Sequence, residues 1–275
     1  RKIGGFPARD ADSEAWLNEG FTEAYTARIL LEAGLWSIDD FVADWNISLA
    51  RYGTSPVATA PNARIQAERQ KDFDVNRLPY DRGRILAILW DDVIRSRTQG
   101  RLSLDQILRQ QMEMASKSSS QSASADVLFP AVVKTMTGFD LGSQLDRYVQ
   151  RGERLKLQMN AFGPCVIVTA HTQPAFDRGF DLPATLSANR HVTGLEAGGP
   201  AERAGLHAVD KIAIDEVPTH DSRTVLTYRV TSEDGQSRVI SYHPEGTTQV
   251  TFQQLALTRK GHMYPAECRK SLSRP

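Results

Sequence analysis

The stretch Trp16-Leu-Asn-Glu-Gly-Phe-Thr22 lies in a segment, residues 13–33, whose apolar side chains recur at helical spacing. Ser13 is a favourable N-cap residue, and Gly34 follows as a typical signal for a helix C-terminus. A glycine inside a helix costs about 1 kcal/mol relative to alanine, so Gly20 needs an explanation. Either a second helix packs closely at Gly20 while Glu19 faces solvent, or Glu19 has a chemical role.

The rest of the first half also has helical patterns. A second helix begins at Ser37, a third runs from about Pro79 to Arg97 with proline in its first turn, and a fourth opens at Ser103. Two short helices are expected over residues 126–136 and 141–150. Residues 53–77 are predicted to form a long irregular connection, and the polar stretch 117–125 a mobile loop.

The second half, after about Leu155, has the pattern of a small β-rich domain. Its β-branched runs predict strands at residues 165–169, 190–194, 211–215, 238–242 and 249–252, with turns at 233–235 and 243–246. We therefore expect a multi-domain α + β protein with a helical unit at 1–157, a β-rich unit at 158–260 and a polar tail at 261–275.

The overall composition is that of an ordinary globular protein. The chain has 275 residues, which favours two domains, with 40% hydrophobic and 24% charged residues. Its 33 basic residues balance its 33 acidic ones without a basic stripe, so nucleic acid is not an expected partner. The longest apolar runs, such as 85–90, are too short to span a membrane. The start at Arg1 leaves the compartment, bacterial cytoplasm or periplasm, open.

The cysteines and histidines give no metal-binding pattern. Cys165 and Cys268 are far apart, and two isolated thiols are expected. None of the histidines belongs to a His-Glu-x-x-His sequence, which would place two imidazoles on one helix face. We expect surface or packing roles for all of them: His171, His191, His207, His220, His243 and His262.

The seven residues 16–22 resemble the third-ligand helix of the gluzincin zinc peptidases. In those enzymes a His-Glu-x-x-His helix supplies two ligands and a second helix supplies a glutamate. Catalytic zinc takes three protein ligands and keeps one position for water. The resemblance implies that Glu19 is a zinc ligand, and that Glu23, one turn later, supports it from the same helix face.

The segment Leu78-Pro-Tyr-Asp-Arg-Gly83 resembles the part of these enzymes that carries the catalytic tyrosine. That tyrosine donates a hydrogen bond to the oxyanion that develops on the scissile carbonyl. The resemblance gives this role to Tyr80. Taken without its context, Tyr80 is also consistent with an ordinary amphipathic residue in a first helical turn.

The run from Gly198 to Leu206, followed by a strand opened by Asp210, resembles the bacterial PDZ signature, although Val209 stands where glycine is usual. PDZ domains bind extended peptides by adding a strand to a sheet edge, while a nearby loop captures the terminal carboxylate. The resemblance places that loop near Arg178, Gly179 and Phe180. A PDZ shell without a ligand is the alternative.

The three motifs, in this order, resemble the PDZ-containing glycyl aminopeptidase family over roughly residues 13–257, and Leu141 to Glu153 is similar to that family's last helix. The resemblance implies a helical, thermolysin-like gluzincin C-terminal subdomain followed by a PDZ domain. The expected activity is zinc-dependent removal of N-terminal residues from peptides.

The His-Glu-x-x-His helix is expected upstream of Arg1, so the fragment alone is expected to bind zinc poorly and to be inactive. The face of helix 13–33 that would meet that helix makes a homo-oligomer conceivable. The competing hypothesis is a non-catalytic peptide-binding module built on a peptidase-derived scaffold.

Overall fold

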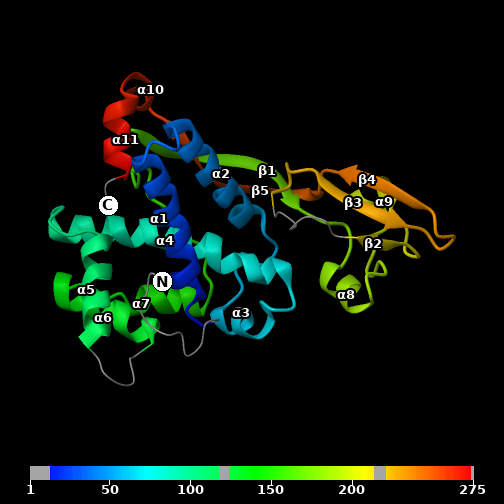
Figure 1. The fold of residues 1–275 in the computed structure, drawn as a ribbon, viewed down its shortest axis with the longest axis horizontal. Helices are drawn as coiled ribbons and strands as arrows, with labels where there is room; N and C mark the ends of the chain where they lie inside the picture. The colour runs from blue at the N-terminus through cyan, green and yellow to red at the C-terminus, as the bar shows by residue number, and fades with distance from the viewer. Residues whose placement is uncertain (1–12, 118–123, 214–220, 274–275) are drawn as a thin grey trace.

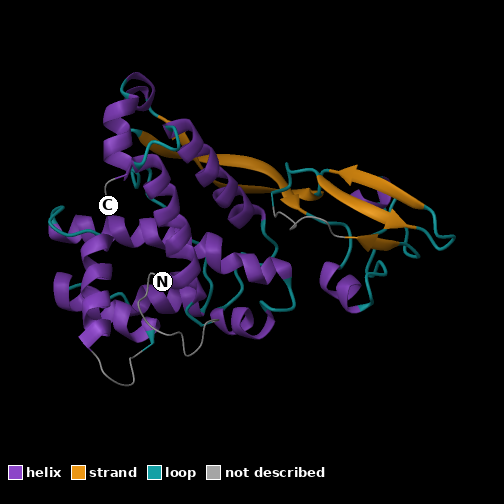
Figure 2. Cartoon of the chain, in the orientation of Figure 1, coloured by secondary structure: helices purple, strands orange, loops and turns teal. Residues whose placement is uncertain are grey.

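The computed structural model describes residues 13–117, 124–213 and 221–273. The protein is a mixed α/β structure in which most helices gather in one half and small sheets extend from it (Figures 1 and 2). Two long antiparallel strands connect the two halves (Figure 1).

The helical half contains eight consecutive helical segments and the last two helices of the described chain. They are α1 (Ala15–Glu32), α2 (Ile38–Thr54), α3 (Asn62–Glu68), α4 (Phe73–Thr98), α5 (Leu104–Lys117), α6 (Ala125–Thr137), α7 (Gly142–Leu145), the π-helical turn η1 (Asp146–Gln150), α10 (Arg259–Met263) and α11 (Pro265–Ser273). None of the helices in the described ranges has both the length and the apolar character needed to cross a membrane.

The capping signals explain where several helices begin and end. Ser37 and Asp40 form a reciprocal capping box at the start of α2, where a helix was predicted to begin. Gly34 takes a positive φ of 73° after α1, the conformation in which glycine ends helices. The predicted cap Ser13 is wrong by one residue, because Glu14 occupies the N-cap position of α1 and makes no side-chain cap hydrogen bond.

The prediction of an irregular connection at 53–77 is wrong. This stretch contains α3, and α4 begins at Phe73 because the Asp72 carboxylate accepts hydrogen bonds from the N–H groups of Asp74 and Val75. Pro79 therefore lies inside α4 rather than in its first turn. Proline removes one helical hydrogen bond there, and the burial of both Pro79 and its neighbour Leu78 offsets that loss.

Five strands form two small antiparallel sheets in the described part of the chain. Strand β1 (Val166–Phe176) pairs with β5 (Glu245–Leu257), while β2 (Lys211–Ala213), β3 (Leu226–Thr231) and β4 (Ser237–Tyr242) form a sheet in that order. The short helices α8 (Leu182–Ser187) and α9 (Pro200–Arg203) cover this β-rich half. The predicted strand at 190–194 is wrong, because it makes only one isolated bridge, His191 to Lys211.

Two separate hydrophobic cores support the two halves. In the helical core the rings of Trp16, Phe21, Trp90 and Phe129 meet mostly edge to face, with centroids 5.4 to 6.2 Å apart. The second core lies around Phe180, Tyr228 and Ile212 in the β-rich half. The near ends of β1 and β5 contribute Val166, Val168 and Leu255 to the helical core, so the long strand pair belongs to both halves.

The two cysteines form a disulfide, so the expectation of isolated thiols is wrong. Cys165 precedes β1, Cys268 lies in α11, and their Cα atoms are 5.7 Å apart despite a separation of 103 residues. Residues 259–273 fold into α10 and α11, and α11 packs against α1. Because the C-terminal helix α11 packs back against α1, the two sulfur atoms come together. The spacing of the two cysteines in the sequence does not indicate this disulfide.

A buried carboxylate, Asp91, ties three helices together. Its oxygens accept hydrogen bonds from Arg28 of α1 at 3.2 Å, from Arg95 of α4 at 3.0 Å and from the Leu104 N–H at the start of α5 at 2.8 Å. Burial alone would raise the pKa of Asp91, but Arg28, Arg95 and the Leu104 N–H outweigh it and hold the pKa below its usual value.

The pH dependence of stability tests this cluster. Because the folded pKa of Asp91 is lowered, its contribution is present above the unfolded pKa of about 4 and is lost as pH falls through the folded value. Asp92 and the Tyr25–Asp105 pair also face this region. We expect urea unfolding to show a steeper loss of stability between about pH 5 and pH 3 for the wild type than for Asp91→Asn. Equal slopes for the two proteins would contradict the assignment.

Candidate functional site

Helices α1 and α4 cross in backbone contact at two glycines (Figure 1). A Cβ built on Gly20 would lie 2.3 Å from the Gly83 Cα, and one built on Gly83 would lie 1.8 Å from the Trp16 carbonyl oxygen. No side chain fits at such separations. Close packing therefore explains Gly20, and the same packing decides which side chains of the two helices become neighbours.

The crossing places Glu19 of α1 next to Tyr80 of α4. The pKa of the Tyr80 hydroxyl is raised above its usual value, first by partial burial and then by the nearby Glu19 carboxylate. Arg69 and Arg77 act in the opposite direction. Both Glu19 and Tyr80 remain partly exposed, so the pair can meet a ligand from solvent.

Charged side chains behind Tyr80 fix its orientation. The Arg77 guanidinium lies over the Tyr80 ring, 4.8 Å from its centroid. Arg77 also lies 3.8 Å from a Glu23 oxygen and 3.6 Å from an Asp81 oxygen. Arg51 of α2 donates two hydrogen bonds to Asp81, of 2.7 and 3.2 Å. These four charged residues, which alternate in sign, therefore join α1, α4 and α2 beside the site.

Sequence reasoning singled out Glu19, Glu23 and Tyr80, whose roles stay predictions, and it did not single out their neighbours Arg77, Asp81 and Arg51. Asp81 lies inside the Leu78–Gly83 segment, and Arg77 directly precedes that segment. The local sequence does not indicate which residues of other helices these two side chains contact. The structure places Glu23 beside Arg77, one turn after Glu19. Its supporting role toward a zinc ligand stays a prediction.

The described residues do not by themselves form a zinc site. No group of three or more His, Cys, Asp or Glu side chains in the described part of the chain could hold a metal ion. Glu19 offers one carboxylate, whereas catalytic zinc takes three protein ligands. The five described histidines lie on the surface or pack, and the His171 ring lies against Phe252 with centroids 5.5 Å apart. His220 lies outside the described residues, as do residues 118–123 of the expected mobile loop.

The three residues assigned to peptide capture have structural partners. The Arg178 side chain, 6% exposed, donates to Asp74 of α4 at 3.1 Å and lies over the Phe176 ring. Phe180 is buried against Tyr228 in the second core. Gly179 takes a positive φ of 78° and packs against Ala201 of α9. Their role in peptide binding stays a prediction, and Arg178 joins the β-rich half to α4.

No protein-family model matches the sequence, and no curated protein matches it either. The fold is similar to the crystal structure of an aminopeptidase N family protein from Idiomarina loihiensis, with a TM-score of 0.57 and 15% sequence identity. The match covers 96% of this chain and 49% of that one, so this chain spans about half the length of that protein. The likeness shows that the two proteins share a fold over this length.

Proposed function

We propose that this chain carries part of the active site of a zinc-dependent aminopeptidase, with Tyr80 as oxyanion donor and Glu19 as one metal ligand. The supporting observation is that these two residues, from distant segments, become neighbours where α1 crosses α4 at Gly20 and Gly83. The shared fold with an aminopeptidase N family protein is consistent with this proposal.

The chemistry of Tyr80 follows from its surroundings. Because its pKa is raised, the hydroxyl stays protonated throughout the physiological pH range and can donate a hydrogen bond. A donor fixed in place stabilises the negative charge that appears on a carbonyl oxygen during peptide hydrolysis. The Arg77 guanidinium lies over the tyrosine ring, and its ion pairs with Glu23 and Asp81 hold it there, which keeps Tyr80 in position.

Glu19 is the one metal ligand that we propose from the described residues. Zinc, when bound, would polarise the scissile carbonyl and lower the pKa of a bound water. The remaining ligands and the general base would have to come from outside the described residues. Glycine or alanine at the N-terminus of the substrate is the preference that the family resemblance implies.

For the β-rich half we propose peptide binding of the PDZ kind. Strand β4 lies at the edge of the sheet β2-β3-β4, and an edge strand offers unpaired backbone groups to an extended peptide. The turn before β2 is closed by Asp210, whose carboxylate accepts a hydrogen bond from the His207 N–H at 2.7 Å. This turn therefore forms although Val209 replaces the usual glycine.

Replacing Tyr80 by phenylalanine tests the catalytic assignment. In the intact protein we expect kcat on an N-terminal alanine anilide to fall about 100-fold with little change in KM, because the lost hydrogen bond is made in the transition state. Glu19→Gln should lower both turnover and the zinc content measured by mass spectrometry.

Tyr148→Phe is a matched control for Tyr80→Phe. Tyr148 is also partly buried and carries an arginine, Arg147, over its ring at 5.2 Å, but it lies in η1 away from Glu19. Its removal should leave turnover unchanged. Full activity of both Tyr80→Phe and Glu19→Gln would refute the proposal. An intact protein that holds no zinc and binds peptides without cleaving them would instead be a non-catalytic peptide-binding module.

A further inference from the structure

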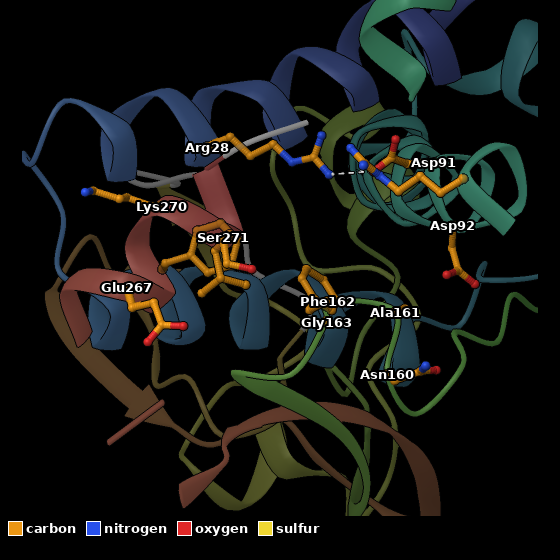
Figure 3. A pocket seen from close by; sticks show the side chains of 13 residues that line it. Arg28, Asp91, Asp92, Asn160, Ala161, Phe162, Gly163, Glu267, Lys270 and Ser271 are labelled. Atoms are coloured by element: carbon orange, nitrogen blue, oxygen red, sulfur yellow. Dashed lines mark hydrogen bonds and ion pairs between the residues drawn. The ribbon is translucent and has the colours of Figure 1, made fainter. Parts of the chain in front are cut away.

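A pocket of about 690 Å³ lies between α1, α4, the loop at residues 160–163 and α11 (Figure 3). This volume is within the size range of pockets that hold small molecules. The pocket is distinct from the candidate site, because Arg28 in its lining follows Glu19 by nine residues, roughly 14 Å along the α1 axis.

The disulfide fixes two walls of this pocket relative to each other. Cys165 follows the loop residue Gly163 by two positions, and Cys268 lies in α11 between the lining residues Glu267 and Lys270. A covalent bond therefore joins the loop wall to the α11 wall. A pocket with covalently tied walls needs little ordering when a ligand enters.

Two arginines in the lining share one carboxylate. Arg28 Nη2 donates to an oxygen of Asp91 at 3.2 Å, and Arg95 Nε donates to the same oxygen at 3.0 Å. Figure 3 marks the bond from Arg28. Asp105, the acidic residue that accepts a hydrogen bond from Tyr25, makes no ion pair with either arginine in the described part of the chain. The two arginines therefore carry one positive charge more than Asp91 neutralises.

Both guanidinium groups keep hydrogen-bond donors that no described residue uses. Nε and Nη1 of Arg28 have no hydrogen-bond partner among the described residues, and its side chain lines the pocket with 12% of its surface exposed. Arg95 Nη2 is buried and also lacks a partner there. An unsatisfied donor on a charged group is costly. An anionic acceptor placed beside Arg28 would use the first two donors and offset the charge of the third.

The remaining charges in the lining do not cancel this excess. Glu267 accepts a hydrogen bond from Lys260 at 2.7 Å, so its charge is already paired. The Asp92 carboxylate points away from Arg28 in Figure 3, and no arginine is among the groups that shift its pKa. Lys270 points away from the pocket as well. The electropositive end of the pocket is therefore at Arg28 and Arg95.

Apolar side chains form much of the rest of the lining. Phe41 lies in α2, Phe162 in the loop and Leu272 in α11, so three separate elements contribute. Figure 3 shows Phe162 below the Arg28 guanidinium. A ligand held at Arg28 would therefore extend over apolar surface.

We propose that this pocket binds a small organic anion, one carboxylate on an apolar body, with the carboxylate at Arg28 and Arg95. Arginine donates charge-assisted hydrogen bonds to carboxylates in a planar, often bidentate geometry. One excess positive charge matches one carboxylate, whereas a phosphate dianion would leave a net negative charge in a partly buried place. A ligand ammonium group would be repelled by the two arginines. The proposal is independent of catalysis at Glu19 and Tyr80.

Calorimetric titration of the full chain with four probes of one shape tests the proposal. The probes are isocaproate, its neutral amide, L-leucine and isopentyl phosphate. We expect isocaproate to bind most tightly and the amide about tenfold more weakly, because the amide lacks the charge. L-leucine carries the same carboxylate with an ammonium group beside it and should also bind more weakly than isocaproate.

Two substitutions of opposite sign locate the carboxylate. Arg28→Gln should weaken isocaproate binding about tenfold and remove the discrimination against the amide. Because Arg28 also supports Asp91, circular dichroism must show that this variant is folded. Asp92→Asn leaves both arginines in place and removes the other negative charge of the lining, so it should strengthen isocaproate binding about twofold.

Matched controls separate this pocket from general charge effects and from the candidate site. Arg64→Gln removes one charge of an exposed ion pair on α3, and Asp140→Asn one of an exposed pair beside α6. Both should leave the affinity unchanged, as should Glu19→Gln. The proposal is overturned if isocaproate does not bind at millimolar concentration, or if the amide or the phosphate binds as tightly. It is also overturned if Arg64→Gln weakens binding as much as Arg28→Gln, or if Asp92→Asn weakens it.

Discussion

Replacing both Cys165 and Cys268 with alanine is expected to lower the free energy of unfolding by about 4 kcal/mol. The bond closes a ring that spans 103 residues, and opening it gives the unfolded chain more conformations. The bond also ties α11 to the start of β1, next to the helical core. Guanidinium unfolding followed by circular dichroism measures the change.

Alanine is the appropriate substitution because both cysteines are fully buried, at 1% and 0% exposure, and serine would bury a hydroxyl. A reducing agent should destabilise the wild type by a similar amount and leave the double alanine variant unchanged. Two free thiols per chain in the native, unreduced protein would show that the bond is not present.

The substitution Gly83→Ala is expected to destabilise the protein by about 3 kcal/mol, the upper end of the cost of overpacking. The added Cβ would meet the backbone oxygen of Trp16, and a backbone cannot turn aside as a flexible side chain can. The higher helix propensity of alanine, worth about 1 kcal/mol, reduces the loss only in part. Thermal and urea unfolding both report the change.

Gly100→Ala is the matched control for Gly83→Ala. Gly100 has a positive φ of 75°, and no described atom lies within 4 Å of the position that an added Cβ would occupy. Its substitution therefore costs only backbone strain of about 1 kcal/mol. A loss for Gly83→Ala no larger than that for Gly100→Ala would contradict the crossing. Gly20→Ala touches the same contact, so its effect should not add to that of Gly83→Ala.

Local patterns predicted the helices well, because caps and periodicity are contained within a few residues. The start of a helix at Ser37 and the end of one at Gly34 are examples. The start of α4 was predicted too late, at Pro79, because proline is favoured in the first turn of a helix. The helix begins instead after the N-cap Asp72, seven residues earlier. Strand β3 was missed although its residues alternate between buried and exposed, a pattern visible in Leu226–Thr231.

Long-range features could not be predicted from the sequence. The disulfide depends on α11 returning to α1, a contact that no local pattern indicates. Glu19 and Tyr80 were singled out through a family resemblance, whereas Arg77 and Arg51 were not, because ion pairs between helices leave no local signal.

The long strand pair β1–β5 connects the two halves of the molecule and has one irregularity in its pairing. Strands β1 and β5 stay in register from Val166 to Pro174, and the register then shifts before Phe176. The ion pair Arg178–Asp74 lies just beyond this shift and anchors the β-rich half to α4. Because this ion pair is buried and lies next to the only register shift between the two strands, it helps to fix the angle between the two halves.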